Sequence, residues 1–236
     1  HFHVMSLEGL GLGDYENGMI ASGAVLQYLY ETQKNDLSHL TKITPYTTGQ
    51  FMMIDTSTRR NLELVETLRE KQKRGSLLWV LDKTKTAMGA RLLRSFIEQP
   101  LIDKMEIERR QQAIEELNMN YISREEIREY LNSVYDLERL MGRISYKTAN
   151  PRDLLSFKNS LEMLPYIKDI LGEFSCELLK KMNEDLDPLR DLYELIDRSI
   201  VDEPPISLRE GNIIKDGYSE EADKYRKAKT EGKAWL

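Results

Sequence analysis

The 236-residue sequence lacks several features that mark secreted, membrane and fibrous proteins. It has a single cysteine, Cys176, so no disulfide can form within the chain, which agrees with a reducing compartment. No apolar run is longer than residues 77–81, whereas a membrane-spanning helix needs about 18 apolar residues. Glycine and proline are scarce, at 13 and 7 residues, which excludes collagen-like and low-complexity chains. These absences predict a cytoplasmic globular protein with no membrane partner.

Patterns typical of catalytic, metal and nucleotide sites are also missing. The three histidines have no cysteine or carboxylate partner at metal-ligand spacing (His1, His3 and His39). The glycines of residues 9–13 do not match a dinucleotide-binding pattern, and no GxxxxGK[ST] loop is present. Cys176 has Glu173 and Glu177 nearby, which should raise its thiol pKa and favours a core or boundary cysteine. We therefore predict no catalytic, cofactor-binding or metal-binding residue, and no enzyme activity, in this chain.

Charge is distributed unevenly along the sequence. The whole chain carries 34 Lys and Arg against 40 Asp and Glu, a net charge of -6. Residues 42–101 nevertheless hold eleven basic and six acidic residues, so this segment of the chain is positive. The basic residues between 59 and 94 could contact nucleic-acid phosphates, or could pair with neighbouring carboxylates or face solvent. Both interpretations stay open. Another positive cluster near the end could follow a phosphate backbone (Arg226, Lys227, Lys229 and Lys233).

Apolar spacing and capping residues predict a mainly all-α fold. Residues 51–55, Phe-Met-Met-Ile-Asp, are the best strand candidate, and residues 35–50 are the best linker candidate. Capping-box spacing occurs at Asp103 and at Ser123, and Pro151 fits the first position of a helix. The predicted helices span 14–33, 58–68, 76–81, 86–99, 136–144, 175–184 and 188–200, and four more begin near 103, 123, 151 and 219.

Five motifs, in this order, resemble the core (lever) domain of bacterial MutS proteins, a family of DNA mismatch repair proteins. They are Arg60–Leu64, Ser76–Asp82, Thr84–Arg94, Asp136–Arg139 with Arg143 and Ile144, and Asn150–Leu154. The stretch around Ala24–Gln27 is similar to the last helix of that family's α/β connector domain. The stretch Lys227–Lys233 is similar to the approach to the family's DNA clamp. The resemblance covers nearly the whole chain.

The resemblance implies three parts. Residues 1–40 would end the connector domain, residues 41–218 would form the helical core domain with its long helices, and residues 219–236 would be a lever helix leading toward a clamp. The family's mismatch-reading domain would precede residue 1, and its clamp and nucleotide-binding domains would follow residue 236. Phe96-Ile97-Glu98 matches the Phe-x-Glu letters of the family's mismatch wedge. We reject that match, because Phe96 shares a helical stripe with Leu92 and should be a core residue.

The resemblance also implies a function. Members of the family are dimers that clamp mismatched double-stranded DNA, couple this to ATP and Mg²⁺, and have a MutL-type partner. This chain would be the transducing middle, with no cofactor of its own. The alternative is a stand-alone helical module that binds nucleic acid through residues 59–94.

The family motifs assign structural rather than chemical roles to their residues. Thr86 would cap a helix, Met88 would pack, and Gly89 would permit a close helix approach. Arg139 and Arg143 would pair with acidic side chains of adjacent helices. The structural motif residues are Asn61, Thr86, Met88, Gly89, Arg91, Arg139, Arg143, Pro151, Arg152 and Asp153.

Overall fold

The computed structural model describes residues 12, 15–32, 37, 38, 40–43, 48–206 and 208–235, with side chains described as far as residue 228. The chain divides into two compact units, residues 1–51 and residues 52–236. Several predictions fall outside the described residues. They concern the cap at Asp14, the three histidines, the glycines of 9–13, much of the linker 35–50, and the side chains of Lys229 and Lys233.

The first unit contains α1 (Glu16–Thr32), which confirms the helix predicted over residues 14–33. None of the α1 residues is buried, whereas Leu12 and Leu37 outside the helix are. A short 3-10 turn, η2 (Thr48–Gln50), follows near the end of this unit.

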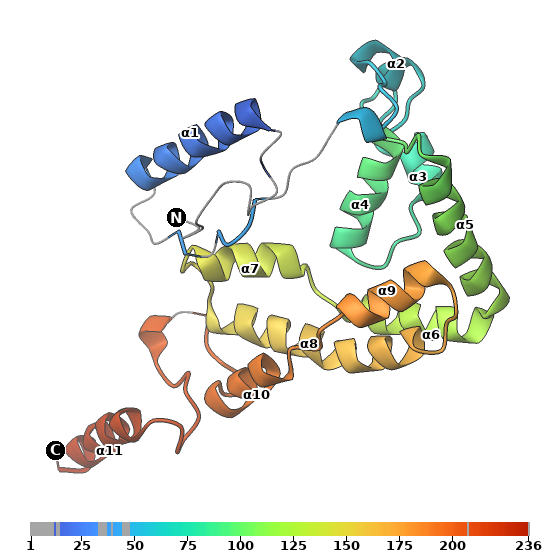
Figure 1. The fold of residues 1–236 in the computed structure, drawn as a ribbon. Helices are drawn as coiled ribbons and strands as arrows, with labels where there is room; N and C mark the ends of the chain where they lie inside the picture. The colour runs from blue at the N-terminus through green and yellow to red at the C-terminus, as the bar shows by residue number, and fades with distance from the viewer. Residues whose placement is uncertain are drawn as a thin grey trace. The chain divides into compact units, whose positions relative to one another are not determined.

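The second unit is built from helices, and α8 (Pro151–Leu171) lies at its centre (Figure 1). This long helix packs against α6, α7, α9 and α10, and α5 packs against α6 and α9. These elements are α5 (Lys104–Met119), α6 (Tyr121–Asn132), α7 (Leu137–Ser145), α9 (Glu177–Asp185) and α10 (Arg190–Ser199). We call α5 to α10 the helix bundle. The all-α fold class predicted from the sequence is confirmed.

Capping residues begin several helices where the sequence predicts. Ser76 caps α3 (Leu77–Leu81), and Thr86 caps α4 (Ala87–Glu98), which ends just before Pro100. Asn150 caps α8 with Pro151 at its first position, and the Asp153 side chain returns a bond to the Asn150 amide, completing a capping box.

Two apolar clusters fill the helix bundle. The first joins α7, α8 and α10 through Leu140, Phe157, Leu161, Leu164, Ile196 and Ile200. The second joins α5, α8 and α9 through Ala113, Ile170, Phe174 and Leu179. Leu161 is 1% exposed. Leu161, Leu164 and Phe157 are all buried on α8.

Some predicted elements are wrong. Residues 52–55 are not a strand, and α2 spans Thr56–Asn61 rather than residues 58–68, because Asp55 accepts the Thr58 amide and starts the helix early. Glu63 then adopts a left-handed backbone with φ 49°, which ends the helical path. Ser123 lies inside α6, where its hydroxyl donates to Glu173 rather than capping. Asp103 caps α5 through the amide of Met105, without a capping box.

The stripe predicted to point inward from α4 is not buried either. No α4 residue is buried, and Leu92 and Phe96 are exposed. Phe96 lies beneath the Arg110 guanidinium, whose carbon is 3.9 Å from the ring centroid. Phe96 is therefore not a core residue within this chain.

After α10, the chain turns back, and residues 213–215 lie beside residues 199–201 at the C-terminal end of that helix. Ile200 and Ile214 form an antiparallel bridge, flanked by bonds from Val201 N to Ile213 O (2.9 Å) and from Lys215 N to Ser199 O (2.8 Å). The 3-10 turn η3 (Leu208–Glu210) lies between them. Next comes α11 (Glu220–Trp235), and the amide of Ala222 donates to Ser219 Oγ, as predicted for its first turn. No helix among the described residues is long and apolar enough to cross a membrane.

A buried serine offers a test of how the helix bundle is held together. Ser160 is fully buried, its hydroxyl donates to Ser156 O at 2.8 Å, and it accepts the Tyr135 amide at 2.9 Å. We expect Ser160→Ala to lower the free energy of unfolding by about 1–3 kcal/mol, because the Tyr135 amide loses this acceptor. Urea titration followed by circular dichroism measures it. Ser95→Ala, which removes an exposed hydroxyl bonded to Leu92 O, is the control. An equal loss in both variants would contradict this role.

Candidate functional site

The motif from Asp82 to Arg91 begins with a turn organised by Asp82. Its carboxylate accepts the Thr84 amide at 3.1 Å and the Thr84 hydroxyl at 2.6 Å, and it pairs with Lys73. The Lys73 ammonium and the Thr84 hydroxyl lower the pKa of Asp82 to about 2. The turn therefore has a fixed geometry on leaving α3.

Thr86 and Gly89 shape the start of α4. The Thr86 hydroxyl accepts the Gly89 amide at 3.0 Å, as an N-cap. A Cβ added at Gly89 would lie 3.1 Å from Thr86 Oγ1 and 3.4 Å from Thr84 Cβ. The close approach at Gly89 is thus to the two threonines of its own loop, whereas the sequence suggested a second helix. Met88 is half-buried.

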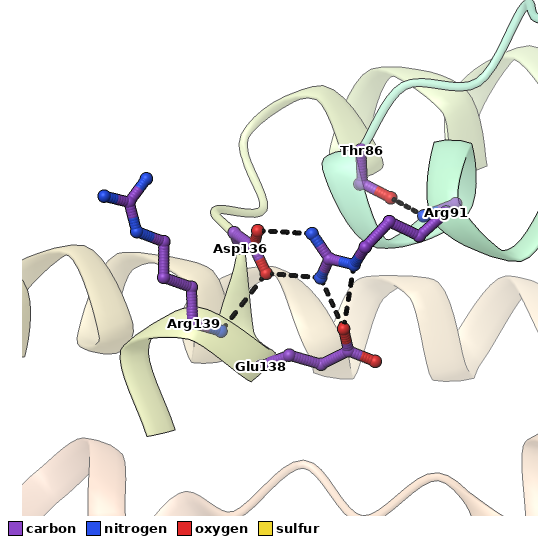
Figure 2. Close-up of polar contacts among 6 residues, drawn as sticks. Thr86, Arg91, Asp136, Glu138 and Arg139 are labelled. Carbon is purple, nitrogen blue, oxygen red and sulfur yellow. Dashed lines mark hydrogen bonds and ion pairs between the residues drawn. The ribbon is translucent and has the colours of Figure 1, made fainter. Parts of the chain in front are cut away.

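Arg91 joins α4 to the start of α7 (Figure 2). Its Nη1 and Nη2 donate to the two carboxylate oxygens of Asp136 at 2.7 and 2.8 Å. Its Nε donates to Glu138 at 3.1 Å, and Nη2 also pairs with Glu138. Such a two-pronged arginine–carboxylate contact is stronger and more directional than a single ion pair. We call Arg91, Asp136 and Glu138 the arginine clamp.

Asp136 serves two elements at once. The same oxygen, Oδ1, that receives Arg91 also accepts the Arg139 amide at 3.2 Å and caps α7. The Arg91 guanidinium lowers the pKa of Asp136 to about 2, and Asp136, followed by Glu138, raises the pKa of Arg91. The clamp and the first turn of α7 therefore share one carboxylate.

Arg143 is engaged as the sequence suggested, but Arg139 is placed differently. Arg143 Nη1 donates to Asp153 at 2.8 Å, which ties α7 to the first turn of α8. The Arg139 side chain extends away from the carboxylates of the clamp (Figure 2). The arginine that pairs with Asp136 is therefore Arg91, 45 residues earlier in the chain.

The remaining motif residues are at helix ends. Asn61 is the last residue of α2 and is exposed. Pro151 is buried at the start of α8, and Arg152 Nε donates to Pro204 O at 3.1 Å. These positions fix helix ends and bring no reactive groups together.

The basic residues of α11 differ in what surrounds them. Arg226 pairs with Asp216 and with Asp223 (3.0 Å), and donates to Ile214 O at 2.8 Å. Arg226 thus connects α11 to the segment around Ile214, the residue that forms the antiparallel bridge with Ile200. Lys227 is exposed.

The basic segment 59–94 is partly neutralised. Lys73, Arg91 and Arg94 pair with carboxylates, the last with Glu98 at 3.2 Å. Arg59 donates to Ile54 O at 3.0 Å. Besides the paired Lys73, four cations of the segment are exposed in α2 and the following loop (Arg60, Arg69, Lys71 and Arg74).

Glu116 is a residue whose role sequence reasoning missed. Its carboxylate accepts the amide and hydroxyl of Ser175, both at 2.6 Å, and the Cys176 amide at 2.8 Å. These bonds lower the pKa of Glu116 to about 2. Burial, together with Glu116, raises the pKa of the Cys176 thiol, in the direction predicted but through a different carboxylate.

Neither a metal-binding cluster nor a phosphate-binding loop pattern is found, the first within the described residues and the second in the sequence. No group of three or more histidine, cysteine, aspartate or glutamate side chains in the described part of the chain is placed to hold a metal ion. The sequence has no GxxxxGK[ST] loop that could cradle phosphates. The motif residues instead form hydrogen bonds and ion pairs that join one helix to another.

Comparison with known proteins gives a consistent picture. A family model described as MutS domain III matches residues 57–233. The chain is 68% identical over 236 residues to a DNA mismatch repair protein MutS from Lachnoclostridium phytofermentans, of which it covers 25%. It is 51% identical to one from Halothermothrix orenii (26% of that protein) and 52% identical to one from Ruminiclostridium cellulolyticum (27%), each over 236 residues. The chain spans about a quarter of the length of these curated relatives.

The lowered pKa of Asp136 predicts a pH dependence. A carboxyl whose pKa is lower in the folded than in the unfolded state stabilises the fold above about pH 4, and this stabilisation is lost as pH falls toward 2. Asp136→Asn keeps an oxygen to cap α7 but loses the charge facing Arg91. We expect the stability difference between parent and variant to be largest near pH 7 and to shrink toward pH 2.

Urea titration at several pH values measures that difference. The parent and the variant are compared at each pH, because the pKa values of Asp82 and Glu116 are also lowered to about 2 and these groups affect both proteins equally. Asp185→Asn, which alters an exposed pair with Lys181, is the control and should change stability little at any pH. A difference for Asp136→Asn that stays constant from pH 7 to pH 2 would contradict the charged clamp.

Proposed function

This chain belongs to the MutS family, and we propose that it is the central structural and transducing domain of a MutS-like DNA mismatch repair protein. The observation that supports this most is the match to MutS domain III over residues 57–233, together with ion pairs that join one helix to another. In this proposal the chain carries no chemistry and passes motion between other parts of the protein.

The helix bundle is suited to such a role. Motion passes through packed, rigid elements that have discrete arrangements. The two apolar clusters along α8 make the bundle one body. Arg226 joins α11 to the segment around Ile214, which pairs with Ile200 at the end of α10. A displacement of α11 would therefore be transmitted to the helix bundle.

We propose the following for the whole protein. It would bind mismatched double-stranded DNA, act as a homodimer in the cytoplasm, bind ATP and Mg²⁺ outside these residues, and have a MutL-type partner. Residues 1–40 would end a connector domain, residues 41–218 would be the core domain, and residues 219–236 would be a lever helix. Lys227, with Lys229 and Lys233, would approach the DNA backbone, whereas Arg226 is drawn toward its carboxylates.

A second candidate function rests on the exposed cations around α2. Four cations gathered near one loop could bind phosphates without sequence preference (Arg60, Arg69, Lys71 and Arg74). This stand-alone nucleic-acid module would need no other domain. The two candidates differ in salt dependence and in mismatch preference.

The transducing proposal predicts what the isolated chain cannot do. We expect the 236-residue chain to hydrolyse no ATP above background and to bind matched and G·T-mismatched duplexes equally weakly, because recognition and nucleotide binding would lie elsewhere. Filter binding and a phosphate-release assay measure both. Mismatch-selective binding or ATP turnover by this chain would contradict the proposal.

The nucleic-acid module predicts a steep salt dependence. If Arg60, Arg69 and Arg74 each contact a phosphate, replacing all three by Ala should reduce the steepness of the plot of log affinity against log salt concentration by about 3. Under the transducing proposal we expect a shallow slope that changes no more than in a control carrying Lys104→Ala, Lys180→Ala and Lys181→Ala. Duplex binding measured between 50 and 200 mM salt, roughly the range in which phosphate contacts are lost, separates the two.

A further inference from the structure

Residues 52–102 make a small folded body of their own, which we call the α2–α4 unit. Its ends meet where the Met52 amide donates to Pro100 O at 2.8 Å. Inside it, the amides of Leu77 and Leu78 donate to Glu63 O (3.1 Å) and Leu64 O (2.9 Å). Leu64, Ser76 and Leu78 are buried there, so the unit has a local interior.

The α2–α4 unit contributes nothing to the two apolar clusters of the helix bundle. Both clusters, including their partly buried members, consist of residues after 112. On the unit's side, α4 has no buried residue, and Leu92 is 54% exposed. Apolar burial, the main stabilising term within each body, is therefore weak between them.

The hydrogen bonds, ion pairs and cation–π contact that cross between the two bodies, among the described residues, are made by arginines. Arg91 on α4 reaches Asp136 and Glu138 in the arginine clamp. Arg128 on α6 donates to Lys83 O at 3.2 Å, and Arg110 on α5 covers the Phe96 ring. The clamp is the contact that pairs full charges, and it holds two carboxylates with one side chain.

Contacts of this kind open more readily than a packed interface. Exposed ion pairs are screened by salt and stabilise only slightly, although two-pronged arginine contacts stabilise more. The Arg91 side chain is half-exposed, so water and salt reach the clamp. Covalently, the unit joins the bundle only through the short stretch from Pro100 to the α5 cap at Asp103.

We propose that the α2–α4 unit detaches from the helix bundle as a folded body, pivoting at residues 100–103, and that the arginine clamp is the latch that keeps it docked. Opening breaks the contacts of Arg91, Arg128 and Arg110 across the boundary while leaving the hydrogen bonds inside each body intact. The unit then has two discrete arrangements, docked and released. This inference goes beyond the proposed transducing role and does not need it, since it concerns two bodies that are both present in this chain.

Distance measurement between spin labels tests the proposal on the 236-residue chain. Cys176 is first replaced by Ser, and labels are attached at Ser57→Cys in α2 and Lys180→Cys in α9, both exposed positions. Arg91→Ala removes the latch. Arg94→Ala is the matched control, because Arg94 is on the same helix, is similarly exposed, and pairs within that helix with Glu98.

We expect one narrow distance distribution for the parent and for Arg94→Ala. Arg91→Ala should raise the ratio of released to docked molecules about tenfold, giving a second, separate distance population. High salt should shift the parent in the same direction, whereas far-UV circular dichroism should stay the same, because no helix melts.

Two results would overturn the proposal. One is a distance distribution in Arg91→Ala indistinguishable from that of Arg94→Ala. The other is a loss of helix signal in step with the new distances, which would mean that α4 unfolds rather than the unit moving as a body. Neither DNA nor ATP enters this experiment, so its failure is distinguishable from a failure of the proposed function.

Discussion

The contact between the Arg91 guanidinium and the carboxylates of Asp136 and Glu138 is the constraint on which the arrangement of the second unit depends. It joins segments 45 residues apart in the sequence. The carboxylate of Asp136 is also the N-cap of α7, so one group fixes both a helix start and the docking of α4. The loop before α4 prepares this contact. Asp82 fixes the turn, Thr86 caps the helix, and Gly89 lets the threonines lie close.

Behind the clamp, the bundle is held together in a different way. Around α8, stability comes from buried leucine, isoleucine and phenylalanine side chains, with polar ties at the helix ends such as Arg143 to Asp153. The α2–α4 unit, which precedes α5, contacts the helix bundle through polar and partly exposed side chains. A body with a dry interior joined to a smaller body by arginines fits a domain that must stay rigid inside while its parts change position.

Local signals explain what the sequence could predict. Thr86, Asp136 and Asn150 cap helices because each side chain reaches the amide three residues ahead, a local contact that the sequence can indicate. The strand predicted at residues 51–55 is absent over residues 52–55, because a run of apolar residues does not by itself indicate whether a partner strand lies beside it. Phe96 was taken for a core residue because periodicity shows an apolar face but not what covers it.

Non-local pairings were beyond the same reasoning. Asp136 pairs with Arg91 from 45 residues away, and Glu116 accepts the Ser175 amide just before α9 from 59 residues away. Nothing in the spacing near either residue indicates such a partner, since the pairing is decided by how helices pack. The carboxylate partners of Arg226 were not predicted either, while the contacts of α11 with a DNA backbone stay a prediction.

A double-mutant cycle on Arg91 and Asp136 tests the central claim most directly. The free energy of unfolding would be measured at neutral pH for the parent, Arg91→Ala, Asp136→Asn and the double variant. The clamp predicts that the two single losses do not add, with a coupling energy of about 1 kcal/mol or more in favour of the pair. Losses that add to within about 0.3 kcal/mol would show that the two residues act independently, and would contradict the account.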